Sequence, residues 1–353
     1  MKLGINFTHD SSVVLTNNLG EIVFAQQEER INRRKNTTLF PKNSIRTALE
    51  IAKQNKEKIE TLHFGSQTPF GGIERVLLSF EDENFAAFDG QYGYVFPPGV
   101  RNKFSQLKEK NNECIFKNKI AELFPELDES KQEIRYFYEN HQDSHASSAF
   151  FASGFSEALS ISLDGHGDGE SGSISVYNID SKIRNLARFK DINSFGHLYA
   201  VTDRYNFKPL KHEGKITGLA AFGSNSPAFE LLLNYLQVKN GVPYFCISEN
   251  RLKILVGKII KRSGISKNCI ITLKDLIDVA ESKTNNYPDL AFAVQEVLNN
   301  LVVEIINYWI RESGVSKITA AGGVFANVKL NQIIWEKTHV TDFFVFPAMG
   351  DSG

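Results

Sequence analysis

Short apolar stretches, separated by turn-forming residues, open the chain and predict β-strands. Branched and aromatic residues fill Leu3 to Phe7, Ser12 to Leu15 and Ile22 to Ala25, and the polar stretch Asn17 to Gly20 precedes the third of these. Strands that follow one another through such short polar turns pair antiparallel. The first thirty residues therefore predict an antiparallel meander.

A second strand pair, Ala158 to Leu163 and Ser173 to Tyr177, follows much later, with helical periodicity before and after it. The clearest helix runs from Pro288 to Ser313, because its apolar residues recur every three or four positions and Gly314 supplies an end signal. Further strands are predicted at 61–64, 134–138, 317–320 and 343–346, and further helices after Pro41 and at 140–152, 194–204, 215–221, 229–236 and 324–335. Residues 240–285 give no clear assignment.

The two similarly built halves predict an α/β protein with two lobes. The chain has 353 residues, which is long for one compact domain. We place the lobes at residues 1–155 and 156–353, with an insertion at about 66–132, where glycines, prolines and charged residues interrupt the pattern. The second lobe stops soon after a predicted strand, so we expect it to be truncated.

Composition narrows the function classes. The chain carries 40 Lys+Arg against 41 Asp+Glu, a formal charge of −1, which gives no positive field for broad nucleic-acid binding. No apolar stretch reaches the length of a membrane helix, and the start does not read as a signal peptide, so we expect a cytoplasmic protein without membrane contact. Cys114, Cys246 and Cys269 lie far apart and are expected to be buried, reduced thiols.

His141 and His145 are the first candidates for chemistry. They stand four residues apart on a predicted helix, so both imidazoles share one side, as two ligands of one divalent metal would. Asp351, in a glycine-rich loop after a predicted strand, is the candidate third ligand. Such a set suits Fe²⁺, with Mn²⁺, Zn²⁺ or Mg²⁺ as alternatives. Two solvated histidines and a plain turn aspartate are the alternative interpretation.

Other motifs suit an anionic ligand. The stretch Leu163 to Ser173 is predicted as a turn rich in glycine, in which Asp164 can hold a metal or water and backbone N–H groups can meet phosphate oxygens. Thr8 to Ser12 forms the matching piece of the first hairpin, Lys215 lies near a predicted helix start, and Gly322-Gly323 joins a strand to a helix. Each motif also fits a plain turn or helix cap.

Taken in order, these segments resemble the carbamoyltransferases that modify nodulation factors and antibiotics, whose N-terminal part is similar to the tRNA threonylcarbamoyltransferases. The resemblance spans nearly the whole chain. Its residues are Gly4 to Asn6 with His9 to Ser12, Glu28 to Arg30 with Phe40-Pro41, His141 to Phe150, Leu163 to Gly167, His212 to Gly223, Gly322 to Asn327 and Pro347 to Gly353.

The resemblance implies an actin/hexokinase-like (ASKHA) two-lobed fold with duplicated mixed sheets. It also implies a metal on His141, His145 and Asp351, and a carbamoyl adenylate attacked by a substrate hydroxyl to give an O-carbamoyl product and AMP. His9 would take the hydroxyl proton, with Asp10 as the rival. The residues expected to contact the adenylate are Ser11, Ser12, Asp164, Gly165, Gly167, Lys215, Gly322, Gly323 and Asn327.

Family members usually continue into a YrdC-like domain, which makes carbamoyl adenylate from carbamoyl phosphate and ATP. We expect the chain to lack this domain, so the first half-reaction is expected to come from another domain or subunit. The expected partner is a small acceptor that carries a hydroxyl group. A homo-oligomer is left as a possibility. The rival interpretations are a non-catalytic subunit that binds adenine nucleotide, and another ASKHA kinase or ATPase. The helical histidine pair disfavours the kinase, because phosphoryl transfer relies on carboxylates and magnesium.

Overall fold

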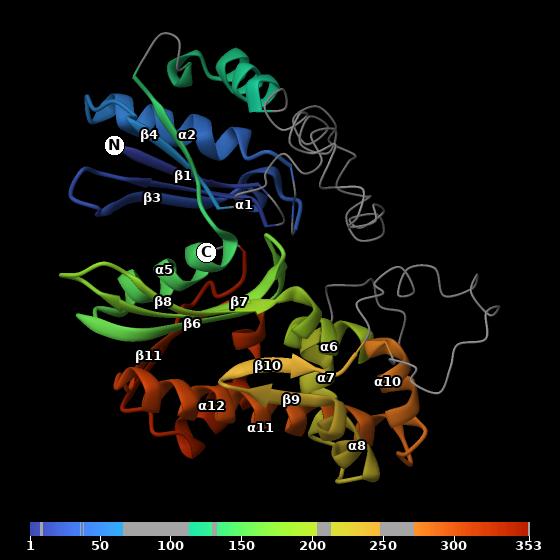
Figure 1. Ribbon diagram of the computed structural model, residues 1–353. Coiled ribbons are helices and arrows are strands. Elements are labelled where there is room, and N and C mark those ends of the chain that lie inside the picture. Colours follow the sequence, from blue (N-terminus) through green and yellow to red (C-terminus); the bar gives the residue numbers. More distant parts are fainter. Residues whose placement is uncertain are drawn as a thin grey trace. The chain divides into compact units, whose positions relative to one another are not determined.

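The computed structural model describes residues 1–7, 10–35, 37, 39–65, 113–128, 133–202, 213–247 and 272–351. It divides into two compact units, which we treat separately: unit 1 contains residues 1–144 and 351–353, and unit 2 contains residues 145–350. The boundary falls inside helix α5 (His141–Ser153). Figure 1 gives the elements and their labels.

Unit 1 is built on a five-stranded mixed sheet, sheet 1, with strand order β3-β2-β1-β4-β5. The predicted meander is confirmed, because β1 pairs antiparallel with β2 and β2 with β3, while β1, β4 and β5 run parallel. The elements are β1 (Lys2–Asn6), β2 (Ser12–Thr16), β3 (Ile22–Gln27), α1 (Glu29–Asn32), α2 (Lys42–Gln54), β4 (Thr61–Phe64), a helical stretch at 113–123, the 3₁₀ turn η2 (Pro125–Leu127) and β5 (Arg135–Tyr138).

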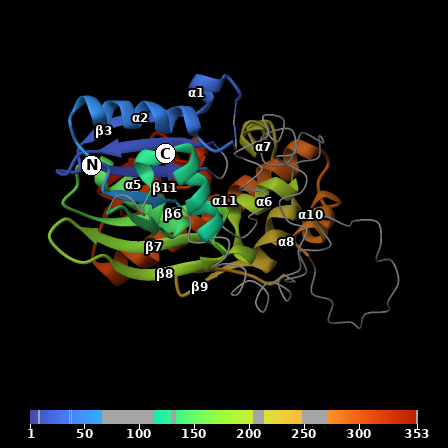
Figure 2. The same cartoon turned by 90° about the horizontal axis from the view of Figure 1, so that it is seen from above.

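One face of sheet 1 packs against α2. The helix presents Ile45, Ala48 and Ala52, spaced at three and four residues, to the strand residues Leu3 and Leu15. In both views α2 runs alongside the strands (Figures 1 and 2). Most of the predicted insertion lies outside the described residues, but its helix at 113–123 contributes buried side chains to the same core.

Unit 2 repeats this plan in a second five-stranded sheet, sheet 2, with strand order β12-β11-β6-β7-β8. β6 pairs antiparallel with β7 and β7 with β8, whereas β6, β11 and β12 run parallel. The elements are β6 (Glu157–Gly167), β7 (Glu170–Asn178), β8 (Arg184–Lys190), η3 (Asp191–Asn193), α6 (Phe195–Thr202), α7 (Glu213–Ala220), α8 (Pro227–Tyr235), β9 (Leu236–Lys239), β10 (Val242–Phe245), α10 (Leu273–Glu281), α11 (Tyr287–Ser313), β11 (Lys317–Ala321), η4 (Gly323–Ala326), α12 (Val328–Lys337) and β12 (Asp342–Val345).

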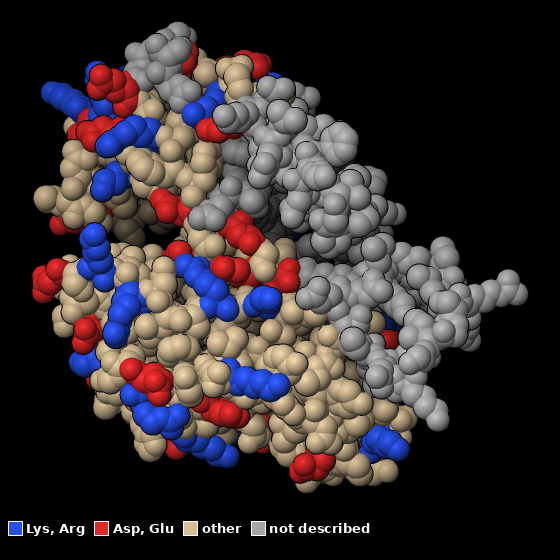
Figure 3. Space-filling view, in the orientation of Figure 1, with Lys and Arg blue, Asp and Glu red and all other residues tan. Residues whose placement is uncertain are grey.

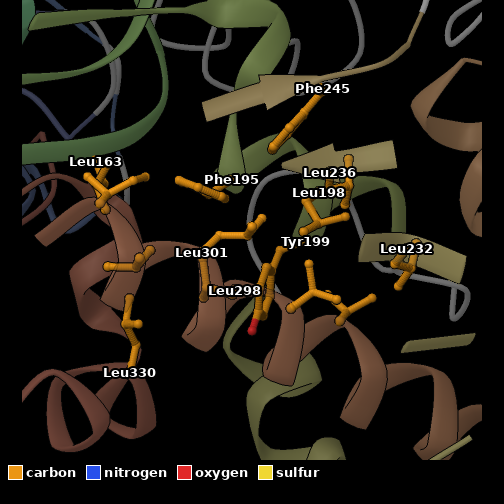
Figure 4. Packing of buried hydrophobic residues seen from close by; sticks show 14 of the residues in the cluster. Leu163, Phe195, Leu198, Tyr199, Leu232, Leu236, Phe245, Leu298, Leu301 and Leu330 are labelled. Atoms are coloured by element: carbon orange, nitrogen blue, oxygen red, sulfur yellow. The ribbon is translucent and has the colours of Figure 1, made fainter. Parts of the chain in front are cut away.

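The core of unit 2 lies between one face of sheet 2 and the long helix α11. Leu298 and Leu301 of α11 belong to the same cluster as Leu163 of β6 and Phe195 of α6 (Figure 4). Beside it, α10 packs against both α6 and α8 (Figures 1 and 2). The other face of the sheet meets α5, where Phe150 packs with Tyr177.

The duplicated strand order confirms the α/β fold with two mixed sheets, as expected of an ASKHA-type protein. Three local predictions are wrong. β6 continues to Gly167, so Asp164 to Gly167 lie in a strand rather than in the turn, which is Asp168-Gly169. The helix predicted at 324–335 is two elements, because Asn327 caps α12 after η4. Cys114 is exposed and Cys246 is half-buried, so neither is buried as predicted, and Cys269 lies outside the described residues.

The surface carries both charge signs. On the face shown in Figure 3, basic and acidic side chains of the described residues are interspersed. Among the described helices, none combines the length and the apolar character needed to cross a membrane. Both observations agree with the composition.

Candidate metal centre

Helix α5 presents both candidate histidines. The side chain of Asn140 accepts hydrogen bonds from the backbone N–H groups of Gln142 (2.9 Å) and Asp143 (3.1 Å), which fixes the start of the helix. His141 is therefore the first helical residue, and His145 follows one turn later on the same side. Both side chains are buried, at 8% and 6% exposure.

In unit 1, Asp351 lies beside His141. The distance from His141 Nε2 to Asp351 Oδ1 is 3.6 Å, and both side chains are largely buried. Asn6, the last residue of β1, donates its amide hydrogens to the backbone carbonyls of Asp351 and Asp10. The structure thus places the acid chosen from the sequence next to the first histidine, and Asn6 is a supporting residue that the sequence analysis missed.

In unit 2, Asp164 lies beside His145. The distance from His145 Nε2 to Asp164 Oδ2 is 3.8 Å. The second carboxylate oxygen, Oδ1, accepts a hydrogen bond from the backbone N–H of Gly323 (3.1 Å). One oxygen of Asp164 therefore faces an imidazole while the other holds a backbone turn.

These two pairs fit the chemistry of a metal site. Separations of 3.6 and 3.8 Å are too long for a good hydrogen bond between the imidazole and the carboxylate. They are close to the ~3.3 Å between two ligand atoms of a tetrahedral ion with bonds of about 2.0–2.1 Å. Each pair offers one imidazole nitrogen and one carboxylate oxygen, which are ligand atoms that suit a divalent transition metal.

The Gly322-Gly323 turn is tightly constrained. Gly322 has φ +97°, and a Cβ there would lie 2.2 Å from the carbonyl oxygen of Leu163, so only glycine fits. Its N–H donates to the carbonyl of Met349 (2.6 Å). The turn is thus bonded to the segments that carry Asp164 and that lead into Asp351.

Asn327, an expected adenylate contact, has its side chain engaged inside unit 2. Its Oδ1 accepts from the N–H of Leu330, and its amide donates to the Tyr199 hydroxyl (3.1 Å) and to Gln295 Oε1 (2.9 Å). Burial raises the pKa of Tyr199 far above its usual value, so this hydroxyl stays neutral. The side chain therefore supports the fold, and its contact with an adenylate stays a prediction.

The first hairpin loop is held by internal bonds. Asp10 adopts a left-handed conformation (φ 56°), and the Ser11 N–H and hydroxyl both donate to the carbonyl of Thr37. Ser12 is buried at the start of β2. His9 lies outside the described residues, so its catalytic role, like that of Asp10, stays a prediction.

Glu28 supports this loop. Its N–H donates to the carbonyl of Ser11 (2.8 Å), and its carboxylate accepts four hydrogen bonds from the backbone and side chains of Asn43 and Ser44, at the start of α2. A carboxylate is stabilised there by the helix dipole. From the sequence, Glu28 was identified only through the resemblance to the family. No local pattern links this residue to α2, which begins at Lys42.

Gly165 and Gly167 lie in β6, close to Asp164 in sequence. A Cβ on Gly196 would lie 2.7 Å from Gly165 Cα, so α6 begins directly against this strand. Lys215 lies exposed in the first turn of α7. The expected adenylate contacts of Gly165, Gly167 and Lys215 stay predictions.

Comparisons with known proteins agree on one family. The family model described as "Carbamoyltransferase N-terminus" matches residues 1–353. The nodulation protein NolNO of Sinorhizobium fredii is 27% identical, covering 98% of this chain and 45% of that protein. The uncharacterized protein MJ1051 of Methanocaldococcus jannaschii is 31% identical, covering 100% of this chain and 55% of that protein.

Among solved structures, the crystal structure of T. kodakarensis HypF is similar at a TM-score of 0.49 and 14% identity, covering 100% of this chain and 46% of that one. The chain thus spans about half the length of these relatives.

Proposed function

The chain belongs to the carbamoyltransferase N-terminus family, and we propose that it transfers a carbamoyl group from carbamoyl adenylate to a hydroxyl of a small natural product. The observation that carries the proposal is the pair of α5 histidines, each beside a buried or nearly buried carboxylate of its own unit. Family membership supports the carbamoyl chemistry, and the donor set supports a metal-assisted reaction.

We propose that His141, His145, Asp351 and Asp164 bind one divalent metal, with Fe²⁺ as the first candidate. Because both histidines share one side of one helix, a single ion can take both imidazoles. When bound, such an ion polarises a carbonyl group and offsets the negative charge of a phosphate.

The remaining candidate residues would bind the carbamoyl adenylate and accept the proton of the acceptor hydroxyl. Backbone N–H groups near Gly165, together with the Lys215 ammonium, would hold the adenylate phosphate, and the Gly322-Gly323 turn would contact the nucleoside. The acceptor oxygen forms a bond to the carbamoyl carbon, the bond from that carbon to the phosphate oxygen breaks, and AMP leaves with the electron pair. His9 or Asp10 would accept the hydroxyl proton.

The direct test supplies synthetic carbamoyl adenylate, a divalent metal and a panel of hydroxylated natural products to the 353-residue chain. The expected result is an acceptor heavier by one carbamoyl group, together with one AMP per product, both followed by mass spectrometry. Supplying the adenylate removes the need for the half-reaction from carbamoyl phosphate and ATP. A chain that binds adenylate and metal but releases neither product nor AMP with any acceptor would favour the non-catalytic subunit.

A further inference from the structure

Asp164 has two different partners, one on each carboxylate oxygen. Oδ2 faces His145 Nε2 at 3.8 Å, and Oδ1 accepts the N–H of Gly323 at 3.1 Å. The Asp164 side chain is 14% exposed, but Gly323 is exposed, so water reaches the Gly323 end of this hydrogen bond. A carboxylate is rigid between its two oxygens, and therefore fixing one oxygen also fixes the other.

The Gly322-Gly323 turn also has anchors of its own. The N–H of Gly322 donates to Met349, and the chain then enters the single 3₁₀ turn η4, whose end is the N-cap Asn327. Gly322 also packs against the backbone of Leu163, and the buried Phe325 side chain holds η4 in the core, so the bond to Asp164 adds to these anchors at Gly323. The bond from Gly323 to Asp164 is thus a direct link between the turn and the side chain beside His145.

We infer that Asp164 couples metal binding to the Gly322-Gly323 turn, so that a metal at His145 orders the turn and strengthens nucleoside binding there. An ion that binds Oδ2 restricts the rotation of the Asp164 side chain and keeps Oδ1 in place for the Gly323 N–H. Linkage then requires that the nucleoside strengthen metal binding by the same factor. The coupling rests on the proposed function, because it needs both a metal and a nucleoside.

The test uses Co²⁺ as the metal, adenosine as the nucleoside and the full 353-residue chain. Adenosine carries no phosphate, so the metal cannot strengthen its binding through a phosphate oxygen. Two quantities are measured with and without saturating Co²⁺: the adenosine Kd by calorimetry, and amide hydrogen exchange of residues 322–327. Saturation of each variant is followed by the visible absorption of bound Co²⁺.

The decisive variant is Asp164→Asn, which keeps an acceptor oxygen for Gly323 and replaces the charged oxygen near His145. In the wild type we expect Co²⁺ to slow exchange of the segment, and to lower the adenosine Kd, by about fivefold or more. In Asp164→Asn we expect metal-free values within about twofold of wild type and no response to Co²⁺. Asp164→Ala should also lose metal-free protection of the segment.

Asp168→Asn is the matched control. Asp168 lies in the β6–β7 turn at φ 52°, which asparagine tolerates, so this change removes a nearby carboxylate without touching Gly323. It should respond to Co²⁺ like the wild type.

A wild type that binds Co²⁺ without slowing exchange at residues 322–327, or an Asp164→Asn protein that responds like wild type, would overturn the coupling and leave carbamoyl transfer standing. A wild type that binds no Co²⁺ would overturn both the metal site and the coupling. If adenosine does not bind, amide hydrogen exchange of residues 322–327 with and without Co²⁺ still tests whether the metal orders the turn.

Discussion

The two sheets share one strand order but differ in how completely they are covered. In sheet 2, every residue from Ser171 to Tyr177 of β7 is buried, because α11 packs on one face and α5 on the other. In sheet 1, α2 covers one face, while Ile22 and Val23 of β3 are 69% and 38% exposed. The same topology therefore encloses the inner strand β7 of unit 2 on both faces, while the edge strands β3 of unit 1 and β8 of unit 2 are both partly exposed.

Matched positions show the difference in detail. By register, Gly4 of β1 lies opposite Val14 and His63, and Ser160, on the strand of sheet 2 that pairs in the same order, lies opposite Ser175 and Thr319. The buried Ser160 hydroxyl donates to the carbonyl of Ala146 in α5 (2.9 Å) and accepts from Thr319 (3.0 Å). Sheet 2 thus fixes the part of α5 that follows His145, whereas Gly4 has no side chain to make such a bond.

The largest expected effect tests whether Asp351 of unit 1 and Asp164 of unit 2 bind the same metal ion. With a single shared ion, His141→Ala and His145→Ala should each weaken binding of the whole ion by more than about 100-fold, beyond what loss of a supporting residue costs. With a separate ion in each unit, each variant would retain one. Metal content is measured after equilibration with Co²⁺ and gel filtration. His63→Ala, a histidine beside Glu139 in sheet 1, is the control and should keep wild-type content.

The next largest effect is expected for Gly322→Ala, in the turn that packs against Leu163 of β6. The new Cβ would meet the carbonyl of Leu163 in a left-handed conformation, so the free energy of unfolding should fall by about 3 kcal/mol or more. Urea denaturation measures the change. At Gly314, φ is +73° but a Cβ meets nothing within 4 Å, so Gly314→Ala should cost only about 1 kcal/mol. Equal losses at the two sites would contradict the close packing at Gly322.

Ser160→Ala tests the polar bridge from sheet 2 to α5. It leaves the buried hydroxyl of Thr319 without its acceptor and the Ala146 carbonyl without the serine donor, so we expect a loss of about 2 kcal/mol in the free energy of unfolding. Urea denaturation again provides the measurement. A loss below about 0.5 kcal/mol would show that the bridge contributes little to stability.

Asn6→Ala tests the end of β1. Because Asn6 donates to the carbonyls of Asp351 and Asp10, its loss should weaken metal binding by about tenfold, as loss of a supporting residue does. Competition with a metal-binding dye measures the affinity. Asn17→Ala removes an asparagine that caps the turn at the other end of the same sheet, and should leave metal affinity unchanged. Equal affinities for Asn6→Ala and wild type would remove Asn6 from the support of the site.

The smallest effect is expected at Gly4→Ala. A Cβ there would meet its nearest atoms at 3.7 and 3.9 Å, which is ordinary contact, and alanine reduces the freedom of the unfolded chain. The free energy of unfolding should rise by about 0.5 kcal/mol. A clear loss of stability in urea would show that the space beside Gly4 is filled, which would remove part of the contrast with Ser160.

The sequence predicted elements well where periodicity and end signals agree. α11 appears as expected because its buried positions repeat at three or four residues and Gly314 ends it. β9 and β10 were missed because they are short, and β8 because its residues alternate weakly, with most side chains exposed or half-buried. The glycines at 165 and 167 suggested a turn, but β6 continues through them with a shift in register.

The candidate site was predictable only in part. The spacing of His141 and His145 fixes their common side of α5, and the glycine-rich loop after a predicted strand suggested Asp351, which the resemblance also implies. The pairing of Asp164 with His145 and the support from Asn6 depend on contacts between residues far apart in the chain, which no local pattern encodes. The capping role of Asn327 was missed because the helix was predicted to begin at residue 324, and its contact with an adenylate stays a prediction.

The most direct test of the central claim is anomalous diffraction from crystals grown with Co²⁺. The proposal predicts one strong peak, about 2.0–2.2 Å from Nε2 of His141 and of His145, with oxygens of Asp351 and Asp164 completing the set. Peaks at two separate positions, one at each histidine, or a bound Co²⁺ that contacts neither histidine, would contradict a single shared ion.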